Sequence, residues 1–225
     1  MATGYFVTGT DTDCGKTLVS VALMQHLQIR GKQVLGMKPV AAGADPTLAG
    51  PRNDDALKLQ AQGSSLQPYE TINPYLFLPP IAPHLAARQA GVTIDFGRIA
   101  GCFRQLANHA DRVVVEGAGG WRVPLGPEGG IAELALRLEL PVILVVGLKL
   151  GCISHALLSA ESIIASGAVL GGWIGSRVEP AMDQAQGNIE TLEQMLPCPC
   201  FGTIPHLDTA DASIAASHLN LATAG

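Results

Sequence analysis

The segment Gly9–Thr17 is the feature that most restricts what this chain can fold into. A short apolar, strand-like run precedes it, and Lys16–Ile29, which has apolar residues at helical spacing, follows at once. In that context, backbone N–H groups of a tight loop and of a helix N-terminus point at an anion. Gly15 lets the backbone approach closely, Lys16 reaches the β- and γ-phosphates, and the Thr17 hydroxyl ligates Mg²⁺. The segment therefore predicts a phosphate-binding loop for a nucleoside triphosphate with Mg²⁺.

The spacing of this loop departs from the usual motif. Counting back from Gly15, the motif places its first glycine at position Thr10, whereas the glycine of this chain is Gly9. The alternative is an ordinary turn with a capping threonine and a solvated lysine. The strand–loop–helix context favours the phosphate loop.

Strand-like and helix-like segments alternate along the chain, and most of the strands are apolar on both faces. The expected strands are Tyr5–Thr8, Val34–Lys38, Arg112–Glu116, Val142–Val146, Gly171–Ile174 and Phe201–Ile204, and the expected helices are Lys16–Ile29, Asp54–Gln62, Asp95–Asn108, Ile131–Leu138, Ile153–Ser166 and Asn188–Met195. This alternation predicts an α/β fold with a doubly wound, mostly parallel sheet, P-loop NTPase-like, in one nucleotide-binding catalytic domain over residues 1–225. The segment Ala41–Pro83 is expected to hold one helix and loops that cover a site.

Composition excludes several classes of partner. The formal net charge is −5, aromatic residues make up 4% of the chain, and no Lys/Arg cluster occurs. Nucleic-acid binders need a basic face or stacking aromatics, so nucleic acid is not an expected partner. The longest apolar run is too short to span a membrane and the N-terminus lacks signal-peptide features, so we expect a cytoplasmic protein with no membrane partner. Cys198 and Cys200 have the wrong spacing for a zinc site.

Polar side chains end two further strands, at the edge where ligands of doubly wound sheets bind. Lys38 ends the second strand and could neutralise a transferring phosphoryl group, although a lone lysine is more often simply exposed. Glu116 ends the third strand before the glycine-rich run 117–120, and beside a phosphate loop this favours a Mg²⁺ ligand over a capping role. Of Asp54 and Asp55, which open a helix, one is expected to cap it or charge its first turn, and the other to complete the metal site.

These strings, taken in order, resemble the dethiobiotin synthetase family, the ATP-dependent carboxylases of biotin synthesis. The resemblance is carried by Tyr5–Thr12, Gly15–Thr17, Lys38–Val40, Arg52–Asn53 with Asp55–Ala56, Asn73–Tyr75, Pro83–His84, Val115–Trp121, Pro141–Cys152 with Ile153 and His155, and Ile204–Pro205. Each string alone is moderately specific, whereas the ordered set over nearly the whole chain is highly specific.

The resemblance implies a homodimeric ligase with Mg²⁺ as cofactor and ATP as co-substrate. Its small-molecule substrates would be 7,8-diaminononanoate, CO₂ and ATP. One amine takes up CO₂ as a carbamate, and ATP phosphorylates the carbamate to a carbamic–phosphoric anhydride. The second amine then closes the cyclic urea, dethiobiotin, and releases phosphate.

The resemblance also implies roles for individual positions. Catalytic residues would be Lys38, Lys16 and Thr12, and Mg²⁺ ligands would be Thr17, Asp55 and Glu116. Nucleotide contacts would be Asp13, Cys14, Gly15, Lys16, Thr17, Leu18, Glu116, Gly117, Ala118, Gly119, Ser176, Arg177, Pro205, His206 and Leu207, and substrate contacts would be Lys38, Ala42, Leu150, Gly151 and Cys152. Of these, residues 205–207 would flank the adenine, and residues 150–152 would bind the far carboxylate across the dimer interface.

Three positions depart from the family pattern. Ala42 replaces a serine that often contacts the substrate, Ser176 an asparagine that often reads the adenine edge, and Asn188 a tyrosine that often helps to hold the substrate carboxylate. An amide has donor and acceptor ends and discriminates adenine better than a hydroxyl does. We therefore predict weak selection of ATP over other triphosphates, measurable as equal turnover rates with ATP, CTP and GTP.

Two other functions remain open. One is a partitioning or regulatory ATPase of the same superfamily, in which hydrolysis switches dimerisation or partner binding. The other is a non-catalytic nucleotide-binding module, which would make Lys38 and Glu116 coincidental. The strings Lys38–Val40 and Gly117–Trp121 favour a small-molecule acceptor, and the segment after Pro205 has no basic amphipathic helix of the kind that binds membranes.

Overall fold

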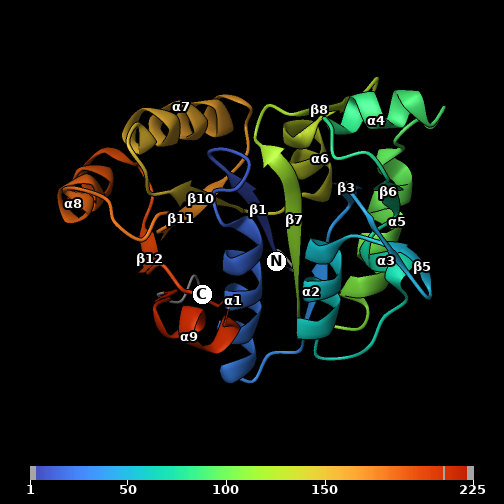
Figure 1. The fold of residues 1–225 in the computed structure, drawn as a ribbon, viewed down its shortest axis with the longest axis horizontal. Coiled ribbons are helices and arrows are strands. Elements are labelled where there is room, and N and C mark those ends of the chain that lie inside the picture. Colours follow the sequence, from blue (N-terminus) through green and yellow to red (C-terminus); the bar gives the residue numbers. More distant parts are fainter. Residues whose placement is uncertain (1–3, 210, 222–225) are drawn as a thin grey trace.

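A six-stranded parallel sheet forms the centre of the structure, a computed structural model that describes residues 4–209 and 211–221 (Figure 1). The strand order is β12–β11–β10–β1–β7–β2, and every neighbouring pair is parallel. The bounds are β1 Gly4–Gly9, β2 Val34–Met37, β7 Arg112–Gly120, β10 Val142–Gly147, β11 Leu170–Ser176 and β12 Cys200–Ile204. Because β1 lies between β10 and β7, the chain crosses over in both directions from the first strand, and the expected doubly wound sheet is confirmed.

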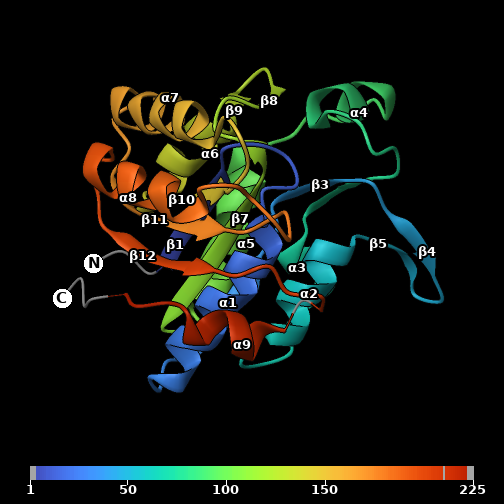
Figure 2. The same ribbon diagram turned by 60° about the vertical axis from the view of Figure 1, so that its left-hand side comes forward.

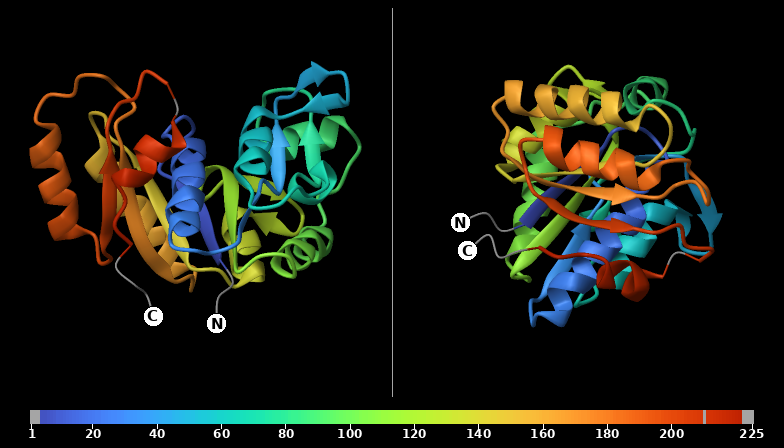
Figure 3. Two further views of the ribbon diagram at one scale, coloured as in Figure 1. Left: turned by 90° about the horizontal axis from the view of Figure 1, so that it is seen from below. Right: turned by 90° about the vertical axis from the view of Figure 1, so that its left-hand side faces the viewer.

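Helices cover both faces of this sheet. They are α1 Lys16–Ile29, α2 Asp54–Gln62, α3 Tyr69–Ile72, α4 Pro83–Gln89, α5 Phe96–Ala107, α6 Ile131–Leu138, α7 Cys152–Ala165, α8 Ala185–Met195 and α9 Ala212–Ser217. One buried apolar cluster joins the sheet to α1, α2 and α9, and a second joins it to α3 through α8. Figure 3 shows the helices on the two faces of the sheet, with α8 and β12 at one end of the molecule and α2, α3 and α4 at the other.

Residues of the central strands alternate between the two apolar clusters. On β7, Val113 and Val115 belong to one cluster and Val114 to the other, and all three are fully buried. On β1, Phe6 and Val7 divide in the same way. Strands that are apolar on both faces in this way form parallel sheets covered by helices, which is why the sequence predicted these strands well.

The prediction that the segment Ala41–Pro83 holds one helix plus loops is wrong. It contains the helices α2 and α3, the parallel pair β3 Val40–Ala42 with β6 Tyr75–Phe77, and the hairpin of β4 Asp45–Thr47 with β5 Gly50–Arg52. The exposed hairpin extends away from the sheet (Figure 2). Strands of three residues and a helix of four are too short for their periodicity to be seen in the sequence.

Two smaller differences bear on the site. The glycine-rich run after Glu116 continues β7 as far as Gly120, although the strand was expected to end at Glu116. It then leads into the hairpin of β8 Pro124–Gly126 and β9 Gly129–Gly130, which packs against α4. Among residues 4–209 and 211–221, no helix has both the length and the apolar character needed to cross a membrane.

Candidate active site

The loop between β1 and α1 has the backbone of an anion site. Asp13 and Gly15 are both left-handed, with φ of 55° and 90°. Such residues turn successive N–H groups toward one side of the chain. Gly15 is also the N-cap of α1, and no side chain caps that end of the helix. The first N–H groups of α1 are therefore available to an anion, and the positive end of the helix dipole faces it.

Glycines allow this loop to pack directly on the ends of β10 and β11. A Cβ at Gly147 would lie 2.9 Å from the Cβ of Cys14, and a Cβ at Gly15 would clash with the Ser176 hydroxyl. Cys14 is buried beneath the loop with 2% of its surface exposed. Its predicted contact with nucleotide is thus limited to its backbone. Lys16 Nζ donates to the Asp11 carbonyl, 2.8 Å away, and Lys149 Nζ lies 3.1 Å from Asp11 Oδ2.

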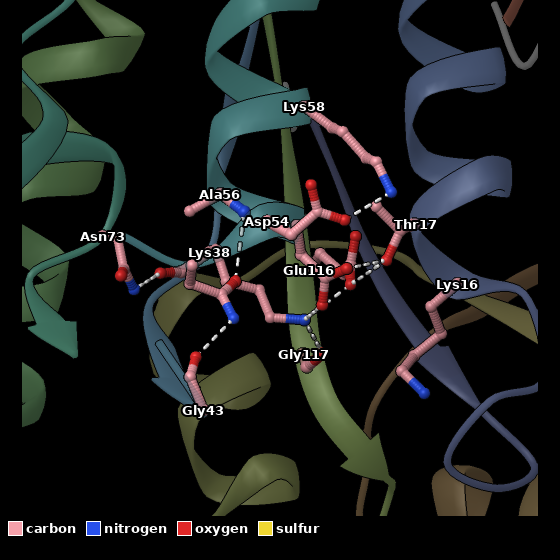
Figure 4. A network of polar contacts seen from close by, with 12 residues as sticks. Lys16, Thr17, Lys38, Gly43, Asp54, Ala56, Lys58, Asn73, Glu116 and Gly117 are labelled. Atoms are coloured by element: carbon pink, nitrogen blue, oxygen red, sulfur yellow. Dashed lines mark hydrogen bonds and ion pairs between the residues drawn. The ribbon is translucent and has the colours of Figure 1, made fainter. Parts of the chain in front are cut away.

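Beside the loop, one lysine and one hydroxyl join two carboxylates from different elements (Figure 4). Thr17 Oγ1 lies 2.7 Å from Asp55 Oδ1 and 3.1 Å from Glu116 Oε1. Lys38 Nζ lies 2.9 Å from Asp55 Oδ2 and 2.6 Å from Glu116 Oε1, and it also donates to the Gly117 carbonyl at 3.4 Å. The two carboxylates are thus held together by the first turn of α1 on one side and by Lys38 on the other.

Two members of this cluster are buried, and Asp55 is partly exposed. The Lys38 side chain is 6% exposed and the Glu116 side chain 0%, so the expectation that a lone lysine here is exposed is wrong. Burial alone lowers the pKa of Lys38, but the charges of Glu116 and Asp55 outweigh it and hold that pKa above its ordinary value. Burial raises the pKa of Asp55, but the charge of Lys38 and the hydrogen bonds from Lys38 and the Thr17 hydroxyl lower it by more. The pKa of Asp55 therefore lies below its ordinary value.

A polar network explains why α2 begins where it does. The Asn53 side chain caps α2 by accepting from the Ala56 N–H at 3.2 Å and donates to the Gly43 carbonyl at 2.9 Å. The helix thus starts at Asp54, which pairs on the outside with Lys58 at 2.6 Å, and Asp55 faces Lys38. The cap is therefore Asn53, and of the two aspartates Asp54 is the first-turn charge.

The same network fixes the backbone of Lys38. The Tyr69 hydroxyl accepts from the Asn53 N–H at 2.8 Å and donates to Asn73 Oδ1 at 3.1 Å. Asn73 Nδ2 in turn donates to the Lys38 carbonyl at 2.7 Å. Since the Lys38 N–H bonds to Ile72, the chain leaves the sheet one residue earlier than expected, after Met37. The strings around Asn53 and Asn73 thus have a physical role, which is to hold Lys38 and Asp55 face to face.

The oxygen atoms in this cluster fit a hard divalent cation. Glu116 Oε2 is buried and has no hydrogen-bond partner, so one strong acceptor is left over. Together with the Thr17 hydroxyl and Asp55, it gives the donor set that Mg²⁺ prefers. The cluster has only two carboxylates, and within residues 4–209 and 211–221 no group of three or more His, Cys, Asp or Glu side chains could hold a metal. The pKa of Cys198 is raised to about 11, mainly by burial and to a smaller extent by the neighbouring Cys200, so that residue is a protonated thiol.

A cavity of about 760 Å³ connects the phosphate loop to the carboxylates. It brings together most of the residues predicted for phosphate, metal and substrate, namely Thr12, Asp13, Gly15, Lys16, Thr17, Leu18, Lys38, Ala42, Asp55, Glu116, Ala118 and Gly119. The rest of its wall is formed by residues 80–83, Val123, Val40, Ala41, Asn53 and Lys58. The Pro-rich composition before α4 suggested a covering segment, whereas Val123 had no signal in the sequence.

The residues predicted for the base and the far carboxylate lie outside this cavity. Arg177 and Pro205 line a second cavity of about 490 Å³ between α8 and β12. Ser176 is 3% exposed beneath Gly15. His206 and Leu207 follow β12 and line neither cavity. Residues 150–152 open α7 and also line neither, and the Leu150 side chain is 94% exposed.

Comparison with known sequences shows which family this chain belongs to. A family model described as an AAA domain matches residues 3–213. The ATP-dependent dethiobiotin synthetase BioD of Pseudomonas aeruginosa (strain UCBPP-PA14) is 48% identical over 222 residues, which cover 98% of this chain and 97% of that one. The protein of the same name from Chromohalobacter salexigens is 51% identical over 233 residues, with 97% and 98% of the two chains covered.

Comparison with solved structures shows the fold alone. The MinD cell division protein of Aquifex aeolicus superposes with a TM-score of 0.59 at 15% identity, covering 97% of this chain and 88% of that one. A ParA family ATPase from Chlorobium tepidum TLS gives 0.54 at 13% identity, covering 97% and 91%. The fold is that of the P-loop NTPases, as expected.

Proposed function

Because this chain belongs to the dethiobiotin synthetase family, we propose that it converts 7,8-diaminononanoate, CO₂ and ATP into dethiobiotin, ADP and phosphate. The observation that carries the proposal is 48% and 51% identity to two bacterial dethiobiotin synthetases over at least 97% of this chain. The enzyme is an ATP-dependent ligase of biotin biosynthesis that forms carbon–nitrogen bonds. We further propose that residues 1–225 act as one catalytic domain and that the enzyme works in the cytoplasm, where ATP is available.

In this proposal the phosphate loop binds the triphosphate of ATP. The left-handed Asp13 and Gly15 turn N–H groups toward it, and the uncapped first turn of α1 adds more. Lys16 lines the same cavity and supplies a positive charge. Phosphoryl transfer depends on positioning and on neutralising charge, which these groups supply.

We propose Thr17, Asp55 and Glu116 as the residues that hold Mg²⁺. The unpartnered Glu116 Oε2 and the shared position of the three side chains on one cavity support this. A bound Mg²⁺ supplies charge that shields the phosphate oxygens from each other.

On the acceptor side, Lys38, Lys16 and Thr12 are the proposed catalytic residues. The carbamate oxygen that attacks the γ-phosphorus is a weak nucleophile that carries negative charge, so it needs a nearby cation to approach the phosphate. Lys38 and Lys16 line one cavity and can provide it from both sides. The second amine then attacks the carbamoyl carbon and phosphate leaves, a step that needs no protein nucleophile. The backbone of Ala118 and Gly119 lies along the cavity where the diamine would sit.

We propose that the far carboxylate of the substrate binds residues 150–152 of a second subunit. In one subunit these residues line neither cavity, although they form a helix N-terminus suited to an anion. Leu150 and Leu158 are 94% and 62% exposed, which supports an apolar contact between subunits there. Analytical ultracentrifugation tests this: a Leu158→Glu variant should lose both the dimer and most of its activity, and a fully active monomer would contradict it.

The test of the reaction is phosphate release with Mg·ATP, bicarbonate and diaminononanoate, with dethiobiotin identified by mass spectrometry. We expect turnover only when the diamine is present. Diamine-independent hydrolysis would instead support the regulatory ATPase. Lys38→Met should lower kcat/KM by roughly 10²–10³-fold, since it removes a charge used in the transition state. Lys32→Met, a matched change at an exposed lysine between α1 and β2, should leave it unchanged.

A further inference from the structure

Lys38 contacts both carboxylates that the metal is proposed to use. Its Nζ lies 2.6 Å from Glu116 Oε1 and 2.9 Å from Asp55 Oδ2. The Thr17 hydroxyl, the third proposed ligand, contacts the other Asp55 oxygen and the same Glu116 oxygen. Figure 4 shows the Lys38 side chain reaching into this group, while Lys16 points away from it toward the loop.

An ammonium and a divalent cation are poorly compatible at this position. Two cations bound to one carboxylate stand close to each other, and their repulsion is strong in a site with little water. The Glu116 side chain is fully buried and Lys38 is 6% exposed, so little solvent screens the pair. At the same time, the fully buried Glu116 carboxylate beside the partly buried Asp55 carboxylate would be unstable without any cation. The site therefore needs one cation at all times and disfavours two.

We propose that Lys38 is the counter-ion of the carboxylate pair when no divalent cation is bound, and that binding of the cation displaces its ammonium into the cavity. This rests on the proposed function only in taking Thr17, Asp55 and Glu116 as metal ligands. The Lys38 side chain is a flexible chain of methylenes and borders the cavity of about 760 Å³ that Lys16 also lines. The displaced ammonium then faces the place where carbamate and γ-phosphate meet.

One consequence is an order of events. The lysine becomes available to the acceptor only after the metal, brought with the nucleotide, has taken its place. An acceptor that reaches the site early finds Lys38 engaged with Glu116 and Asp55. The alternative is a permanent ion pair in which Lys38 stays on the carboxylates and the metal binds beside it.

The two arrangements predict opposite effects on the binding of a metal ion alone. We would measure Mn²⁺ binding to the nucleotide-free protein from the EPR signal of free Mn²⁺, which needs neither nucleotide nor diamine. If Lys38 competes with the cation, Lys38→Met should bind Mn²⁺ at least about tenfold more tightly than the unmodified protein. Lys38→Arg, which keeps the charge, should show no such gain.

Lys58→Met is the matched control for the loss of one positive charge. Lys58 lines the same cavity but pairs with Asp54 at 2.6 Å, and it affects Asp55 only through space. It should change Mn²⁺ affinity by no more than about twofold. Glu116→Gln introduced together with Lys38→Met should remove the gain, which locates the added affinity at the carboxylate pair. Circular dichroism and thermal melting establish that each variant is folded.

The inference is overturned if folded Lys38→Met binds Mn²⁺ no more tightly than the unmodified protein, including no detectable binding by either. It is also overturned if Lys58→Met gains as much. Both outcomes are independent of the reaction assay. Diamine-dependent turnover with unchanged Mn²⁺ affinity rejects the displacement alone, and the reverse pattern rejects the proposed reaction while retaining the displacement.

Discussion

The two sides of the phosphate loop are built differently. Toward β2 and β7, charged side chains contact each other directly. Lys38 Nζ lies 2.6 Å from a Glu116 oxygen and 2.9 Å from an Asp55 oxygen. Toward β11 and β12, the loop rests on glycine contacts, with Gly15 against the Ser176 hydroxyl, and Arg177 is placed by its backbone bond to Ile204 at 3.0 Å. The proposed metal and acceptor side is therefore held by buried charge, whereas the proposed base side is held by backbone packing. The first should be sensitive to the loss of a single charge, and the second to added bulk at its glycines.

The largest expected effect is at Glu116. Glu116→Gln keeps the shape of the side chain but removes the charge that Lys38 and the proposed metal both use. We expect kcat/KM to fall roughly 10³-fold or more, together with a clear loss of thermal stability, because a buried lysine loses its main partner. Glu161→Gln, an exposed position on α7, is the control and should change neither. Near-normal activity in Glu116→Gln would mean that buried charge does not define this side.

Next in size is an effect on base selection. We expect the unmodified enzyme to use ATP, CTP and GTP with kcat/KM values within about tenfold of each other, because Ser176 has only a short hydroxyl side chain that is packed beneath Gly15 and offers the base little discrimination. Ser176→Asn should then favour ATP over GTP by a further factor of about ten, and Ser176→Ala should leave the ratio unchanged. Strict use of ATP by the unmodified enzyme would show that other groups on this side read the base.

The sequence predicted the side built from charged residues better than the side built from backbone packing. The helix Lys16–Ile29 and the helix Asp54–Gln62 were predicted to the residue, because strong local signals begin both. The phosphate loop, Lys38 and Glu116 were found because each stands at the carboxyl end of a strand, where parallel topology brings them together. The burial of Lys38 was missed, because it depends on carboxylates 17 and 78 residues away in the chain.

On the base side, local signals were absent. Arg177 and Pro205 line a separate cavity between α8 and β12, which no spacing in the sequence could show. Val123 in the wall of the first cavity was also missed, since a single apolar residue gives no signal. The hairpin β4–β5 was missed because its strands are too short to show a period. Family resemblance named the base residues, but their placement depends on tertiary packing alone.

A smaller effect tests whether the network behind Lys38 sets its position. Asn53→Ala removes the cap of α2 and should cost about 1 kcal/mol of unfolding free energy, measured by urea denaturation. Asp95 caps α5 in the same manner, accepting from Gly97 and Arg98 N–H groups, and lies away from the cavity lining. Asp95→Ala should lose similar stability and keep its activity. Only Asn53→Ala should also lower kcat/KM, by roughly tenfold, since Asp55 and Lys38 would lose their alignment. Equal activity in the two variants would show that the hydrogen bonds of Asn53 only stabilise the fold and do not position Lys38.

The smallest effect concerns pH and the helix layer behind the base side. His26 of α1 is 4% exposed against α9, its Nδ1 lies 3.4 Å from the Ala216 carbonyl, and its Nε2 has no partner. Burial lowers its pKa below the ordinary value, so the folded protein holds it neutral. The unfolded chain binds the proton first as pH falls below about 6.5, so stability that is complete above that pH declines until the folded pKa is passed. The thermal midpoint of the unmodified protein should thus fall more between pH 7.5 and 5 than that of His26→Gln, which cannot titrate. Parallel pH profiles for the two proteins would show that His26 is protonated without cost, and that the packing of α9 on α1 is looser than the buried contact implies.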